Sequence, residues 1–129
     1  MLFITNRYRW PHFVFSVAAG GDAEVFFYED VTYTDIGIPM AELNLKRSST
    51  TPANVQAYHT PVVSIVPATL LRNTFIPGGT QPRAGGGVER LNTEWILRKS
   101  TNYFIRLYNR AGAAQPLGIV AQWYEEDNN

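Results

Sequence analysis

The chain has 129 residues, no cysteine, and eleven acidic against eleven lysine and arginine side chains. This length suits one domain with a single core. The lack of cysteine excludes disulfide bonds, thiolate metal ligands and a cysteine nucleophile. A formal net charge of zero argues against a protein whose main task is to neutralise phosphates, so we expect no nucleic-acid partner.

Apolar residues make up 45% of the chain and charged residues 17%, fewer than the ~25% typical of globular domains. A surface with so few charges suggests that part of it is covered. The first ten residues have only a short apolar run before Arg7, which is not a signal peptide, and no run of about 18 apolar residues occurs. We expect no membrane partner. Basic residues outnumber acidic ones over residues 36–122, which is either ordinary surface scatter or an assembly contact between unlike patches.

The first third of the chain predicts an arm followed by a hairpin. Residues 1–10 are expected to form an N-terminal arm or edge segment, because a short extended-type run is followed at once by Arg7 to Trp10. Residues 12–17 alternate between apolar and other side chains, which predicts a strand. Gly20, Gly21 and Asp22 then predict a tight turn into a second strand over residues 23–29, so that 12–29 form a β-hairpin.

The middle of the chain has weaker patterning. We expect a short strand over 40–45, a polar loop to Pro52, and strands over 55–58, 62–66 and 70–76, with Pro61 and Pro67 marking strand ends. Residues 77–87 hold five glycines and two prolines, which predicts a long loop. Such a loop would be ordered mainly by contacts with a partner.

The last third predicts a three-strand antiparallel meander over residues 94–126, because three runs rich in β-branched and aromatic residues are separated by Ser, Asn, Gly and Pro. Alternation places one set of side chains in the core. The predicted core residues are Phe13, Phe15, Val25, Phe27, Trp95, Tyr103, Ile105, Leu107 and Trp123.

No segment shows a helical period and no repeat is visible. We therefore expect an all-β protein: an antiparallel β-sandwich, jelly-roll-like, with long irregular loops. Residues 11–126 would form this single domain, and residues 127–129 a tail.

The sequence contains no recognisable catalytic or metal-binding motif. His12 and His59 are isolated among residues that do not bind zinc, the serines lack a nucleophile-elbow context, and the glycine-rich loop lacks the ending of a phosphate cradle. Adjacent acids such as Glu125 and Glu126 point to opposite faces of a strand and do not form an acid/base couple. We expect no enzymatic activity, no metal and no cofactor.

Aromatic residues on both faces of the best strands are the informative anomaly. If Phe27 and Tyr103 face the core, their neighbours Phe26, Tyr28 and Phe104 face away from it. Either loops of the same chain cover this second face, or it is a subunit or partner interface, where Tyr, Phe and Arg are enriched. The candidate interface residues are Tyr28, Phe104, Arg106, Tyr108, Arg83 and Arg90.

Several short segments resemble small virion proteins of tailed bacteriophages. These are YE (28–29), LKRSSTTP (45–52), IPGG (76–79), EWIL (94–97), TNYFIR (101–106), NRAG (109–112) and WYE (123–125), and the similarity spans about residues 10–126. The members with a known role decorate or cement the capsid. The resemblance implies a β-sandwich on the capsid exterior that binds the major capsid protein and neighbouring copies of itself, without an active site.

Two hypotheses follow from these observations. The first is a non-enzymatic phage protein that decorates or cements the head by multivalent protein contacts, made in the host cytoplasm and located in the virion. The alternative is a carbohydrate-binding β-sandwich or tail-fibre receptor module, in which Trp10, Trp95 and Trp123 would stack on sugar rings or else simply pack in the fold.

Overall fold

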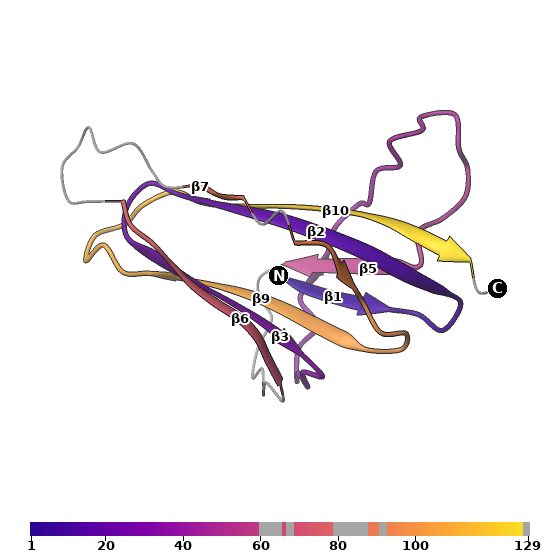
Figure 1. Ribbon diagram of the computed structural model, residues 1–129, viewed down its shortest axis with the longest axis horizontal. Helices are drawn as coiled ribbons and strands as arrows, with labels where there is room; N and C mark the ends of the chain where they lie inside the picture. Colours follow the sequence, from indigo (N-terminus) through magenta and orange to yellow (C-terminus); the bar gives the residue numbers. More distant parts are fainter. Residues whose placement is uncertain (60–65, 67–68, 79–87, 91–92, 128–129) are drawn as a thin grey trace.

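The computed structural model describes residues 1–59, 66, 69–78, 88–90 and 93–127. Its strands form two antiparallel sheets stacked face to face (Figure 1). Sheet A has the strand order β4-β5-β1-β9-β3-β6, and sheet B has the order β10-β2-β7, with β8 also paired to β2. The described part of the chain has no helix, and so none that could cross a membrane. The predicted all-β antiparallel sandwich is confirmed, and its jelly-roll connectivity stays a prediction.

The strands of sheet A are β1 (Leu2–Thr5), β3 (Ala23–Glu29), β4 (Ile38–Pro39), β5 (Val55–His59), β6 (Thr69–Ile76) and β9 (Asn102–Asn109). Those of sheet B are β2 (Arg9–Ala19), β7 (Val88–Arg90), β8 (Trp95–Ile96) and β10 (Leu117–Asp127). The strands predicted over 12–17, 23–29, 55–58 and 70–76 are therefore present. The strand predicted over 62–66 lies outside the described residues except for Val66, which forms an isolated bridge with Thr32. The loop predicted over residues 77–87 also lies outside the described residues, apart from Pro77 and Gly78.

The strand predicted over residues 40–45 is wrong. Only Ile38 and Pro39 pair with β5, and the chain then leaves the sheet. Leu43 and Leu45 face solvent, so no neighbouring strand or core packing holds this segment extended. The hydrophobic residues of this segment predicted a strand, but the segment has no neighbouring strand with which to pair.

The predicted N-terminal arm or edge is also wrong, because β1 is an interior strand of sheet A. It pairs with β5 on one side and with β9 on the other. Leu2 and Phe3 are fully buried on opposite faces, Phe3 in the main core and Leu2 in a second cluster. The short apolar run is sufficient for an interior strand because both of its faces are covered.

The core between the sheets follows the alternation of the strands. Phe13, Phe15 and Val17 of β2 point inward together with Val25 and Phe27 of β3. All nine residues predicted for the core lie in this cluster, with Trp95, Leu107 and Trp123 partly buried at its margin. The Phe13 ring lies at its centre, 4.8 Å from Phe3 and 5.9–6.3 Å from Phe15, Phe27 and Trp123 between ring centroids.

The predicted hairpin over residues 12–29 is wrong in its pairing, although both strands exist. β2 belongs to sheet B and β3 to sheet A, so the turn at Gly20, Gly21 and Asp22 crosses from one sheet to the other. Both strands carry bulky side chains on their inward faces, and crossing between sheets lets these side chains pack against each other.

Hydrogen bonds to Asp22 and a close approach of two backbones stabilise this corner. The Asp22 carboxylate accepts a hydrogen bond from the Gly78 N–H at 2.8 Å, and the Asp22 carbonyl accepts one from the Arg110 N–H at 2.8 Å. A Cβ on Gly78 would lie 2.2 Å from the backbone of Gly21. Only glycine permits two backbones to approach this closely.

The predicted meander over residues 94–126 is wrong for the same reason. β8 and β10 pair with opposite edges of β2 in sheet B, whereas β9 inserts between β1 and β3 in sheet A. The three strands therefore alternate between sheets. Their inward residues still meet, because they face each other across the sandwich.

Candidate protein interface on sheet A

The outer face of sheet A carries aromatic residues because β3 and β9 alternate in register. Phe26 lies opposite Arg106, Tyr28 opposite Phe104, and Glu24 opposite Tyr108. Their neighbours in each strand point into the core, so strand geometry places this set on the opposite face.

Arg106 lies at the centre of this face. Its guanidinium carbon is 5.9 Å from the ring centroid of Tyr28, 5.4 Å from that of Phe104 and 5.6 Å from that of Tyr108. It also donates a hydrogen bond of 3.1 Å to the Tyr108 hydroxyl. No carboxylate among the described residues pairs with it. The rings therefore position a cation that keeps its capacity to bind an anion.

Further aromatic contacts join the side chains of this face. Phe26 stacks on Tyr28 at a centroid distance of 5.9 Å and meets Tyr108 edge to face at 5.5 Å. At its margin Arg110 binds the Glu24 carboxylate through two nitrogens at 2.7 and 3.0 Å. Hydrogen bonds from Asn73 and Arg110 lower the pKa of Glu24, so this carboxylate stays charged and paired near neutral pH.

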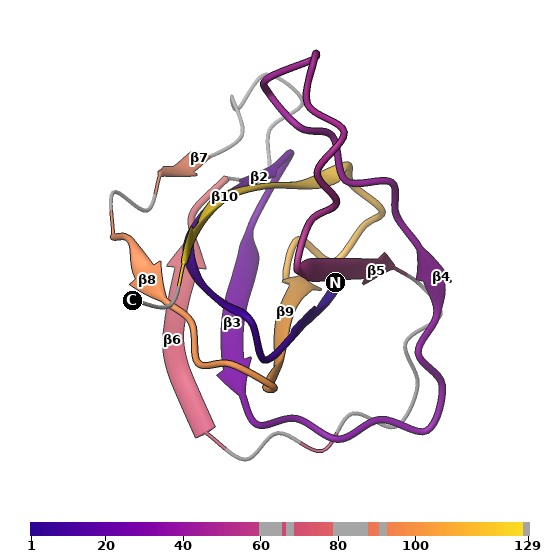
Figure 2. The same ribbon diagram turned by 90° about the vertical axis from the view of Figure 1, so that its right-hand side faces the viewer.

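The chain covers one half of this face itself. The segment that leads from β3 to β4 passes across it (Figure 2), and Val31, Tyr33 and Ile36 pack around Leu2 and Phe104. The other half stays open: Tyr108 is 39% exposed, and Phe75 of β6 is 54% exposed. Of the two explanations for the outward aromatics, cover by the same chain therefore applies to the half around Phe104.

The structure brings four of the six predicted interface residues together, namely Tyr28, Phe104, Arg106 and Tyr108. Arg90 lies in β7 of the other sheet, where its backbone pairs with Ser16, and Arg83 lies outside the described residues. Phe75 also faces outward on this side of sheet A, and it was not among the predicted candidates. Its outward direction depends on the pairing of β6 with β3, where it lies opposite Glu24, and the sequence of β6 alone did not reveal that pairing.

The tryptophans proposed for sugar stacking do not form an open platform. Trp95 and Trp123 pack against the core. Trp10 is more exposed, but the Lys99 ammonium lies 4.7 Å from its ring centroid. A sugar ring would have to displace this lysine before stacking on that face.

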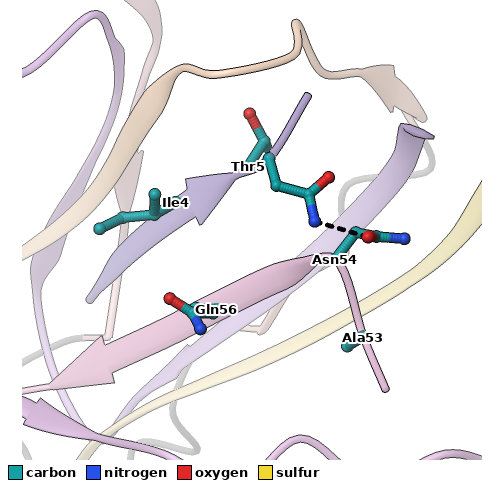
Figure 3. A pocket seen from close by; sticks show the side chains of 6 residues that line it. Ile4, Thr5, Ala53, Asn54 and Gln56 are labelled. Carbon is teal, nitrogen blue, oxygen red and sulfur yellow. Dashed lines mark hydrogen bonds between the residues drawn. The ribbon is translucent and has the colours of Figure 1, made fainter. Parts of the chain in front are cut away.

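A shallow pocket of about 140 Å³ lies where β1 ends (Figure 3). Ile4, Thr5, Asn6, Ala53, Asn54 and Gln56 line it. The Asn6 amide donates to the Asn54 side-chain oxygen at 2.5 Å, and the Asn54 amide donates to Glu125 at 2.7 Å. These polar groups form hydrogen bonds with one another and so connect the strand ends. The pocket therefore offers few free polar groups to a ligand.

His12 forms a polar cluster on the outer face of sheet B. Its Nδ1 contacts Glu94, its Nε2 lies 3.1 Å from Glu126, and its ring stacks on Tyr124 at 4.4 Å. The hydrogen bond to Glu94, aided by Glu126, raises the pKa of His12, while the same contact lowers the pKa of Glu94. Because a carboxylate occupies each ring nitrogen, the imidazole has no free nitrogen to act as a general base.

The described residues contain no group of three or more His, Cys, Asp or Glu arranged to hold a metal ion. No protein-family model, no curated protein and no solved structure matches the chain. The open half of the outer face of sheet A, formed by Phe26, Arg106, Tyr108 and Phe75, is the best-formed candidate site, and we call it the sheet A interface.

Proposed function

We propose that this protein is a non-enzymatic structural protein that decorates or cements a bacteriophage capsid through protein contacts. The observation that supports it best is the sheet A interface. Arginine and tyrosine are enriched at the energetic centres of protein interfaces, especially where apolar side chains exclude water around them. Here Arg106 is held among rings and pairs with no carboxylate of the described residues.

The exposed apolar residues support the same proposal. Large apolar side chains are exposed on both sheets and on the segment between β4 and β5, whereas single-domain proteins usually expose only scattered ones. A repeated lattice such as a capsid would add many weak contacts into stable attachment. The phage context itself rests on the resemblance of the short sequence segments described above.

A census of purified particles tests this proposal. Mass spectrometry should find the protein in virions of the phage that encodes it, in a copy number comparable with that of the major capsid protein. Absence from the particle would contradict the proposal. A few copies per particle would also contradict it and would favour a tail component.

A further inference from the structure

A second exposed feature lies away from the sheet A interface. Residues 40–54, which we call the arm, stand away from both sheets in both views (Figures 1 and 2). Leu43 is 74% exposed and Leu45 is 85% exposed, and Lys46 and Arg47 follow them at the tip. Two exposed leucines beside two cations make this tip both apolar and basic, which is typical of a segment that binds another molecule.

The arm is fixed at both ends. On the way out, the Met40 N–H donates to the Ala57 carbonyl at 2.8 Å, and Glu42 accepts from the Ala57 N–H at 2.8 Å. On the way back, Glu125 accepts from the Asn54 N–H at 2.6 Å. Anchored ends reduce the entropy that is lost when a partner binds the tip.

The tip also has internal structure. The Ser49 N–H donates to the Lys46 carbonyl at 2.9 Å, which closes a turn. The Lys46 N–H donates to the Asn44 side chain at 2.9 Å. Leu43 and Leu45 therefore leave the body on a defined path instead of folding back onto it.

The outer face of sheet B has the complementary chemistry. Ile96, His12 and Tyr124 form one row across the sheet, since both outer residues lie opposite His12. Ile96, Tyr124 and Val120 are 62%, 58% and 60% exposed, and we call these three residues the sheet B patch. They lie on one face of sheet B as a strip of apolar side chains along β8 and β10, which the exposed Gln122 interrupts between Val120 and Tyr124.

The end of this strip is acidic. Glu94 and Glu126 both contact His12, so two carboxylates surround one imidazole and the cluster is negative even when His12 is protonated. The Lys99 ammonium lies over the Trp10 ring, and Trp10 lies opposite Glu126 in the pairing of β2 with β10. A cation of the same chain is therefore already present on the Glu126 side of the cluster. Glu94 is the carboxylate that an incoming cation would meet most easily.

We propose that the arm of one copy binds the sheet B patch of a second copy, with Leu43 and Leu45 on the apolar strip and Lys46 or Arg47 beside Glu94. This contact is additional to the sheet A interface and does not depend on the capsid. The two surfaces differ, so the contact is heterologous and can extend from copy to copy. Because a single arm buries little area, the association in solution is weak, and its strength falls with added salt.

Sedimentation velocity over a range of concentrations tests this inference. The wild-type chain should form dimers and larger species as its concentration rises. Changing Leu45→Asp on the arm, or Val120→Asp on the patch, should each raise the apparent Kd about tenfold or more, as for other interface centres. A mixture of the two variants should recover dimers, because one partner keeps an intact arm and the other an intact patch.

Leu70→Asp is the matched control, since it places the same charge at an exposed residue of β6 beside the sheet A interface. It should leave self-association unchanged. A wild-type chain that stays monomeric throughout would overturn the inference, and so would a mixture that fails to recover dimers while both variants show wild-type thermal unfolding. Neither result bears on virion copy number, so the capsid proposal is tested separately.

Discussion

Replacement of Phe13 by alanine tests the packing between the two sheets. The side chain is fully buried and contacts four other aromatic rings. Truncating a buried phenylalanine costs about 3–5 kcal/mol, and each ring pair adds roughly 0.5–1.5 kcal/mol beyond its buried area. We therefore expect a loss at the upper end of that range, against a total stability of about 5–15 kcal/mol for a typical domain.

Chemical denaturation followed by tryptophan fluorescence measures this loss, and the melting temperature should fall by roughly 15 °C. Phe13→Leu should cost about 1–2 kcal/mol, because leucine fills much of the space without the ring contacts. Ser16→Ala, on the outer face of the same strand, should change stability by less than about 0.5 kcal/mol. A Phe13→Ala protein as stable as Ser16→Ala would refute the inward direction of β2 and the core built on it.

Three further results are expected. Trp95→Phe should cost less than about 1 kcal/mol of stability, compared with about 3 kcal/mol for Trp95→Ala. The buried indole N–H has no hydrogen-bond partner among the described residues, so its removal relieves a desolvation cost. Equal losses of the two variants in chemical denaturation would contradict this. The pKa of His12 is raised in the folded state, so the cluster adds stability that is fully present below the unfolded-state pKa of 6.5 and is lost as pH rises through the folded-state pKa. The free energy of unfolding should therefore fall between these two pKa values in the wild type and not in His12→Gln. Identical pH profiles of the two proteins would argue against the cluster. Glu125→Gln should speed amide hydrogen exchange at Asn54 and Val55, because the Glu125 carboxylate accepts hydrogen bonds from both N–H groups, at 2.6 and 3.1 Å. Unchanged exchange at both residues would show that Glu125 does not anchor the arm.

The alternation of side chains predicted strands and core well, because a strand with period two reveals its buried face locally. Phe13, Phe15, Val25 and Phe27 were assigned to the core from this pattern alone, and all four lie there. The alternation also revealed the outward aromatics around Arg106, since the neighbour of a core residue must face away.

Strand pairing could not be predicted in the same way. Short connections were interpreted as hairpins, yet the turn at Gly20 and Gly21 crosses between sheets. Local sequence does not distinguish these two cases, because both place the same inward residues in one core. The interior position of β1 was missed for a related reason: it depends on β5 and β9, which are fifty or more residues away in the sequence.

The exposed arm was missed because Met40, Leu43 and Leu45 suggested a strand. Hydrophobicity indicates burial only if another surface is available, and the described chain offers none to these leucines. Exposed apolar residues on a segment fixed at both ends are more typical of a contact with another molecule.

Cosedimentation with capsid shells assembled from the major capsid protein alone tests the proposed function most directly. The wild-type chain should bind the shells, and the double variant Arg106→Ala, Tyr108→Ala should lose most of this binding, because the sheet A interface would lack its cation and its exposed ring. Tyr8→Ala, which removes an exposed ring outside that interface, should bind like the wild type. Binding of the double variant at the wild-type level, or failure of the wild-type chain to bind the shells, would contradict the account.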